Sequence, residues 1–131
     1  MSTAAPAFAG LGPIAQIALR VTDVPRAVAF YRDALGMRQL PIAAPPSMAF
    51  FDCGGVRLML STAEAPEFDR PGSVMYFRVD DIDAAHRALV DRGVPFIDAP
   101  HLVARMPDHE LWMAFFTDPD DNPLAIMAEK R

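Results

Sequence analysis

The sequence predicts an α+β fold built from two tandem strand–helix–strand–strand–strand modules. An internal repeat carries this prediction, together with the short apolar strands that follow each predicted helix. The segment LRVTDVPRAVAFYRDALGM, from Leu19, matches FRVDDIDAAHRALVDRGV, from Phe77. The offset between the copies is 58 positions at their start and 57 at the glycines Gly36 and Gly93. The second helix is therefore one residue shorter than the first.

The first module is expected to open with a strand over residues 14–21, IAQIALRV, because apolar residues alternate along it. The residues expected on one of its faces are Ile17, Leu19 and Val21. Asp23 is expected to cap the following helix, with Pro25 in its first turn. Gly36 is expected to end that helix, because glycine adopts positive φ without strain.

In the second module Asp81 is the expected cap and Gly93 the expected end of the helix. The remaining strand candidates are residues 36–41, 47–54 and 56–61 in the first module and 94–100, 110–117 and 123–129 in the second. Gly54-Gly55 and the segment DPDDNP are typical of hairpin turns. These elements divide the chain into a flexible tail (1–13) and one domain (14–131). Within the domain, module one is 14–61, the linker 62–72 and module two 73–129.

Composition limits the functional classes. The chain has 131 residues, of which 52% are hydrophobic and 22% charged, as in a single globular domain. A net charge of -5 argues against a nucleic-acid partner, which needs a basic surface. No apolar run is long enough to cross a membrane, and the N-terminal segment lacks the positive charges of a secretory signal. With a single cysteine, Cys53, and thus no internal disulfide, we expect a cytoplasmic protein.

The repeat, together with FFDCGGVRLML and FFTDPDDNPLAIM, resembles the vicinal oxygen chelate superfamily, from about Ile14 to Glu129. That family includes glyoxalase I, extradiol dioxygenases, methylmalonyl-CoA epimerase, and the fosfomycin and bleomycin resistance proteins. The resemblance implies the glyoxalase/bleomycin resistance fold, a mixed sheet curled into a half-barrel around a central cavity. It also implies a homodimer, because the two halves of the cavity often come from different chains.

The resemblance further places the family's four metal ligands at Gln16, Met59, Val74 and Ala125. Only Gln16 offers an oxygen, whereas a hard divalent ion needs several oxygen or nitrogen ligands. We therefore expect no metal and no other cofactor. The leading hypothesis is a metal-independent protein that binds a small organic molecule in the sheet cavity. Sequestration of a drug, as in the resistance proteins, is one form of such binding.

Strand alternation suggests which residues line the cavity. The expected lining residues are Gln16, Arg20, Arg57, Met59, Val74, Tyr76, Arg78, Trp112, Ala125 and Met127. The arginines favour an anionic ligand, because a guanidinium holds a carboxylate through two hydrogen bonds. The alternative is that Arg20 and Arg78 simply pair with nearby aspartates. Trp112 and Phe115 could form an aromatic wall, or Trp112 could belong to the core.

The segment MPDHELWMAFF concentrates the titratable residues. His109, Glu110 and His101 are the acid–base candidates, for a lyase, isomerase or epimerase. Alternation places His109 and Glu110 on opposite faces, which weakens the hypothesis that they act as a pair. His101 could approach His109 across a loop of residues 102–108 and form a relocated metal site with Glu110 or Asp108. The remaining alternative is a polar strand entrance without chemistry.

Overall fold

The computed structural model describes residues 8, 10, 13–62 and 72–131. Most of the expected tail and linker therefore lies outside the described residues. The first sheet contains, in spatial order, β1 (Gln16–Arg20), β4 (Val56–Ser61), β3 (Met48–Cys53) and β2 (Arg38–Gln39). The second contains β5 (Met75–Arg78), β8 (Pro123–Lys130), β7 (Glu110–Thr117) and β6 (His101–Arg105). The helical segments are α1 (Val24–Val28), the π-helix η1 (Ala29–Ala34) and α2 (Ile82–Asp91).

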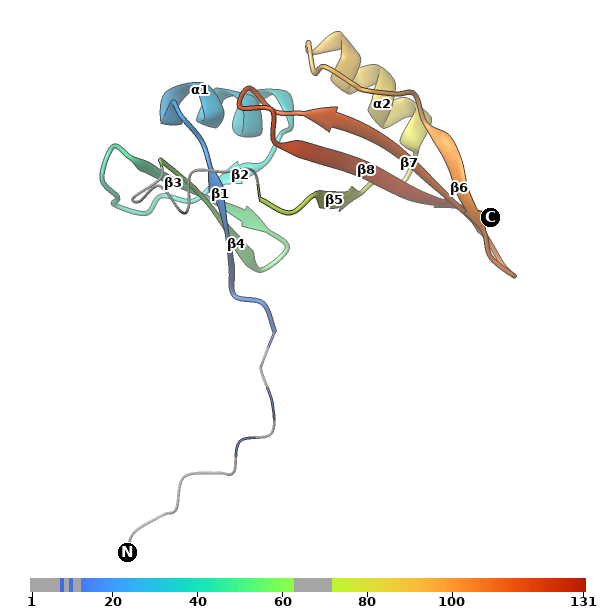
Figure 1. Ribbon diagram of the computed structural model, residues 1–131, viewed down its shortest axis with the longest axis horizontal. Helices are drawn as coiled ribbons and strands as arrows, with labels where there is room; N and C mark the ends of the chain where they lie inside the picture. Colours follow the sequence, from blue (N-terminus) through green and yellow to red (C-terminus); the bar gives the residue numbers. More distant parts are fainter. Residues whose placement is uncertain (1–7, 9, 11–12, 63–71) are drawn as a thin grey trace, which may run out of the picture.

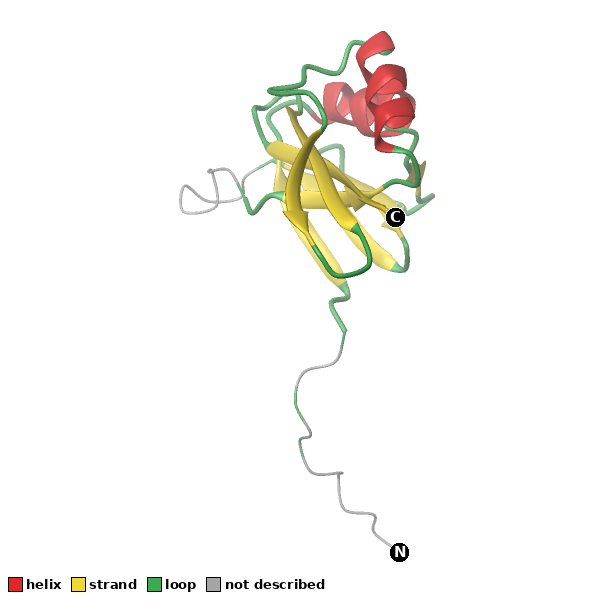
Figure 2. Cartoon of the chain, turned by 90° about the vertical axis from the view of Figure 1, so that its right-hand side faces the viewer, coloured by secondary structure: helices red, strands yellow, loops and turns green. Residues whose placement is uncertain are grey.

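This arrangement confirms the α+β fold of two equivalent modules (Figure 1). In each sheet the first strand of the module pairs in parallel with its last strand, and the other pairs are antiparallel. The helical segments of the two modules, α1 with η1 and α2, lie on the same side of the strands (Figure 2). Each sheet therefore has one face covered by a helix and one face without a helix, which we call its open face.

The core lies between the helices and the covered faces. Leu19, Phe51 and Leu58 of the first sheet are buried there, as are Phe116 and Leu124 of the second. Burying a side chain of this size contributes about 1.5–3 kcal/mol, so these residues fix which face of each strand turns inward. None of the described helices is long and apolar enough to cross a membrane.

The expected helix boundaries are confirmed. Asp23 and Asp81 each accept a hydrogen bond from the backbone amide three residues later, at 3.0 and 3.1 Å. Pro25 lies in the first turn of α1. Gly36 and Gly93 have φ of 73° and 83°, a conformation that favours glycine after a helix.

The first helix is not the continuous α-helix that its apolar spacing predicted. After Val28 it becomes a π-helix, in which the Leu35 amide donates to the Phe30 carbonyl at 3.0 Å. The extra residue of the first copy explains this change. Between the same two ends, an additional residue is accommodated by widening one turn from the α to the π pattern.

One strand was placed wrongly. Residues 94–100 contribute only an isolated bridge between Phe96 and Phe116, and β6 instead covers part of the expected loop at 102–108. Pro95 and Pro100 have no amide hydrogen and interrupt the ladder. The Asp98 carboxylate accepts from the Phe115 amide at 2.8 Å, where a strand would have supplied a carbonyl.

Candidate functional site

The open face of the first sheet carries a glutamine–arginine pair. Arg57 donates from Nε to the Gln16 side-chain oxygen at 2.8 Å, and its guanidinium lies 5.5 Å from the Phe50 ring centre. The Gln16 amide nitrogen lies 3.8 Å from the Met59 sulfur. Gln16 and Arg57 are exposed and Met59 half-buried, so this expected group is brought together at a surface that a ligand can reach.

The positions where the resemblance places metal ligands do not fit a metal ion. The only oxygen among them, on Gln16, accepts a hydrogen bond from a guanidinium, whose positive charge opposes a second cation. Met59 offers a thioether, and Val74 and Ala125 offer alkyl groups. No step of the protein's chemistry is therefore assigned to a metal at these four positions.

The open face of the second sheet carries aromatic rings. Tyr76 and Phe115 meet edge to face with ring centres 6.0 Å apart, and the His101 ring, from the neighbouring row, lies nearly parallel to that of Phe115 with ring centres 6.4 Å apart. Ala125 pairs with both Tyr76 and Phe115 in the ladder and is fully buried between them. Tyr76 and Phe115 thus form one row with the small Ala125 between them, and Tyr76 remains 49% exposed.

The next row of this face runs through Arg78, Met127, Met113 and His101, which are successive partners across the sheet. Arg78 is exposed and makes no hydrogen bond or ion pair with any described residue. Both methionines are half-buried, which leaves apolar surface beside the guanidinium. Val74, immediately before β5, shares the alternation of Tyr76 and Arg78.

Of the expected lining residues, Trp112 lies on the other face of its sheet. Trp112 packs against the core on the covered face, where its indole donates to Glu110 at 3.0 Å and Lys130 lies 4.0 Å from its ring centre. The expected aromatic wall of Trp112 with Phe115 is therefore wrong, because the two residues lie on opposite faces. Arg20 shares the alternation of Gln16 along β1, is half-buried, and accepts a hydrogen bond from the Asn122 side chain through its backbone carbonyl at 3.0 Å.

His109 and Glu110 are directed apart, as alternation predicted. His109 contacts the Asp108 carboxylate at 2.7 Å and Glu129 at 3.6 Å, while Glu110 turns to Trp112. Arg131 completes a ring of charges by donating to Asp108 at 3.2 Å and Glu129 at 2.9 Å. The pKa of Asp108 is lowered, first by the His109 hydrogen bond and then by that of Arg131.

A depression of about 480 Å³ lies at this end of the second sheet. It is lined by Arg105, Met106, Asp108, His109, Glu110, Lys130 and Arg131. Its charges are matched in pairs: Arg105 with Glu110 at 3.4 Å, and Lys130 with Asp83 at 2.9 Å. The depression is therefore a polar surface with little unsatisfied charge.

The expected approach of His101 to His109 is also wrong. His101 pairs with Met113, four residues further along β7 than His109. At about 3.4 Å per residue, the two histidines lie at opposite ends of the hairpin. The described part of the chain contains no group of three or more His, Cys, Asp or Glu side chains that could hold a metal ion.

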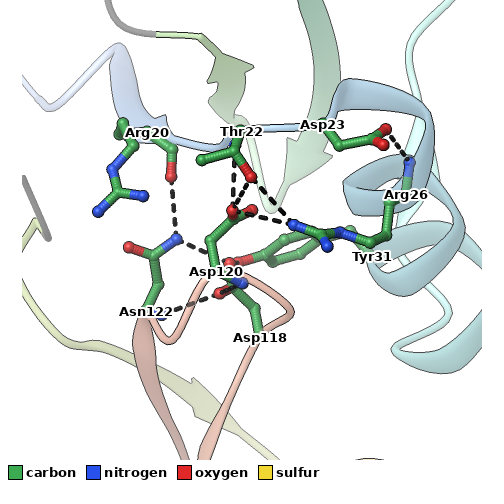
Figure 3. A network of polar contacts seen from close by, with 8 residues as sticks. All are labelled: Arg20, Thr22, Asp23, Arg26, Tyr31, Asp118, Asp120 and Asn122. Atoms are coloured by element: carbon green, nitrogen blue, oxygen red, sulfur yellow. Dashed lines mark hydrogen bonds and ion pairs between the residues drawn. The ribbon is translucent and has the colours of Figure 1, made fainter. Parts of the chain in front are cut away.

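A second polar network joins the modules (Figure 3). The β7–β8 turn brings Asp118, Asp120 and Asn122 against the first module. Tyr31 donates to Asp118 at 2.8 Å, and Arg26 pairs with Asp120 at 3.2 Å. Asp120 also accepts from Thr22, and Asn122 donates to both Asp118 and the Arg20 carbonyl. Because most of its groups bind one another, this network holds the fold together.

Phe50 was not among the expected contacts of the candidate site, although it pairs with Met59 across the β3–β4 hairpin. Phe115 was expected there, but beside Trp112. It has the same alternation as Met113 and pairs with Ala125, so counting along β7 places it on the open face without Trp112. The contact between His109 and Glu129 gave no such signal, because the two residues meet only through the strand register.

Comparison with known proteins identifies the family. The model of the Glyoxalase/Bleomycin resistance protein/Dioxygenase superfamily matches residues 13–126. An uncharacterized protein, YraH of Bacillus subtilis, is 29% identical over 126 residues, covering 85% of this chain and 94% of YraH.

Three solved structures illustrate the range of similar folds. A member of the same superfamily from Sphaerobacter thermophilus matches with a TM-score of 0.74 and 24% identity, covering 91% of this chain and 98% of its own. Lactoylglutathione lyase from Agrobacterium tumefaciens matches with a TM-score of 0.68 and 25% identity, covering 91% of this chain and 95% of its own. TnmS3, an antibiotic binding protein from Streptomyces, matches with a TM-score of 0.73 and 25% identity, covering 94% of this chain and 100% of its own. The chain belongs to the Glyoxalase/Bleomycin resistance protein/Dioxygenase superfamily.

Proposed function

We propose that this protein binds a small organic molecule on its open faces without a metal ion, as a sequestering protein of the resistance type. One observation carries the proposal. Of the four positions where the resemblance places metal ligands, Gln16 is bound by Arg57 and lies beside Met59, and the other two, Val74 and Ala125, are apolar. Such surfaces suit ligands that are mainly apolar with a few polar groups.

The similarity to TnmS3, an antibiotic binding protein, supports this choice. We further propose a cytoplasmic homodimer, in which a second copy covers part of the open faces and encloses the ligand. The partly exposed Tyr76 and Met127 are apolar groups that such an arrangement would remove from water.

A library of drug-like compounds tests this function by thermal shift, because a ligand that binds only the folded state raises the melting temperature. Hits are then mapped by amide chemical shifts. The proposal requires at least one compound that perturbs the open faces equally well with and without a chelator. Compounds that bind only after metal is added would overturn it. Sedimentation velocity measures the oligomeric state.

A second candidate is a lyase, isomerase or epimerase that acts by proton transfer. The similarity to lactoylglutathione lyase favours it, as does the position of His101 on an open face, with its side chain 45% exposed. His109 and Glu110 support it less well, since they are directed to opposite faces. Turnover of lactoylglutathione that is lost in His101→Gln and kept in His86→Gln would establish this alternative.

A further inference from the structure

We infer that the open face of the second sheet takes a planar aromatic carboxylate, with its ring over Phe115 and its carboxylate on Arg78. This inference rests on the proposed function and specifies the chemical class of the ligand. It starts from two neighbouring rows of the sheet. One row consists of the rings of Tyr76 and Phe115, and the other of Arg78, two methionines and His101.

The ring-binding part is flat and preformed. Ala125 is the residue between Tyr76 and Phe115, and its methyl group is too short to separate a ligand from the two rings. Phe115 is held from both sides, by the Tyr76 edge at 6.0 Å and by His101 at 6.4 Å. A planar ligand can stack or meet these rings edge to face, whereas an aliphatic ligand gains only burial. Met113 and Met127 extend the surface with flexible, polarisable side chains.

The anion-binding part is Arg78. Its guanidinium is exposed and has no hydrogen-bond or ion-pair partner among the described residues. The nearest acid along β8 on this face, Glu129, is held by Arg131 at 2.9 Å. The five donors of a guanidinium match the two oxygens of a carboxylate. Arg57 of the first sheet is less available, because its Nε already donates to Gln16.

The spacing between the two parts defines the size of the ligand. Phe115 and Arg78 lie two strands apart and on adjacent rows, roughly 12 Å between Cα atoms for strands about 4.8 Å apart. The arginine side chain covers about half of that distance. What remains corresponds to one or two fused rings carrying a carboxylate. A net charge of -5 slows the approach of an anion but does not remove the local attraction of Arg78.

Calorimetry with four probes tests the inference. They are naphthoate, its neutral carboxamide, a naphthylmethyl ammonium and the aliphatic cyclohexane carboxylate. Naphthoate is expected to bind at least about tenfold more tightly than the other three. Arg78→Met is expected to remove the preference for naphthoate over its carboxamide, while Arg87→Met, on the exposed side of α2, keeps it. Phe115→Leu is expected to weaken naphthoate more than cyclohexane carboxylate.

Amide chemical shifts decide where each probe binds and separate the two proposals. Shifts at Tyr76, Phe115 and Arg78 with naphthoate support the inference. Equal affinities for naphthoate and its carboxamide, or naphthoate binding unchanged in Arg78→Met, overturn it. If the ammonium or another library compound binds the open faces while naphthoate does not, the ligand class is wrong and the proposed function stands. If no compound shifts residues on either open face, both fail.

Discussion

The hydroxyl of Tyr31, in the π-helix of the first module, donates a hydrogen bond of 2.8 Å to the buried carboxylate of Asp118 in the second. Tyr31 is fully buried and Asp118 is 3% exposed, so water cannot replace this contact. Asp118 also accepts from the backbone amides of Asp120 and Asn122, each at 2.9 Å. The Tyr31 hydroxyl therefore links a helix of one module to a turn of the other.

Replacing Tyr31 with phenylalanine is expected to destabilise the whole domain. The change leaves a buried carboxylate with one donor fewer, at a cost of about 1–3 kcal/mol. Urea unfolding measures the difference in the free energy of unfolding. The other tyrosine provides a matched control, because Tyr76 is half exposed and Tyr76→Phe should change stability by less than about 0.5 kcal/mol. Equal losses in both variants would contradict a special role for the contact.

The same tyrosine predicts a loss of stability at alkaline pH. Burial, followed by the charge of Asp118, raises the pKa of Tyr31 well above its ordinary value of 10.0. Because the folded state keeps the proton more tightly than the unfolded state, the contribution is complete below pH 10 and declines above it. The slope approaches about 1.4 kcal/mol per pH unit. Unfolding curves between about pH 8 and pH 11 should show this decline in wild type and not in Tyr31→Phe. Parallel curves would refute it.

Asp108 is expected to titrate below its ordinary pKa of 3.8, because His109 and Arg131 both bind its carboxylate. Its contribution to stability is present above that value and is lost as the pH falls through the lowered pKa. Carboxyl chemical shifts follow the titration directly. His109→Leu should raise the pKa of Asp108 more than Arg131→Gln, since the His109 hydrogen bond is the larger cause. Arg38→Gln, on β2, serves as a control that should leave it unchanged.

Protein purified without an affinity tag is expected to contain well below one metal ion per chain. The physical reason is the donor set, in which the single oxygen of Gln16 is bound to Arg57. Elemental mass spectrometry measures the content, with a zinc protein purified in parallel as positive control. A chelator should leave the melting temperature unchanged. A stoichiometric metal that stabilises the fold would contradict the assignment.

The sequence alone predicted the features that depend on neighbouring residues. Caps such as Asp23 and helix-ending glycines such as Gly36 act over three or four positions, and the internal repeat confirmed each assignment twice. Alternation along β7 also separated His109 from Glu110 correctly. These signals can be read from the sequence because a cap bonds an amide three residues later and the faces of a strand alternate every two residues.

Features that depend on register were not predictable in the same way. The position of β6 is decided by Pro95 and Pro100, which lack an amide hydrogen, and by the Asp98 side chain, which accepts from the Phe115 amide in place of a backbone carbonyl. That shift of one strand decides the distance between His101 and His109. Similarly, nothing near Tyr31 in the sequence indicates that it contacts a turn 87 positions later.

The widened turn of the first helix makes the two copies unequal partners. The helix of the second copy has no tyrosine, and the hairpin turn of the first copy, Gly54-Gly55, has no side chain with which to receive one. The Tyr31–Asp118 hydrogen bond between the copies therefore has no counterpart from the second helix to the first turn. Each half expressed separately therefore loses this contact, the first leaving the Tyr31 hydroxyl and the second the Asp118 carboxylate without its partner.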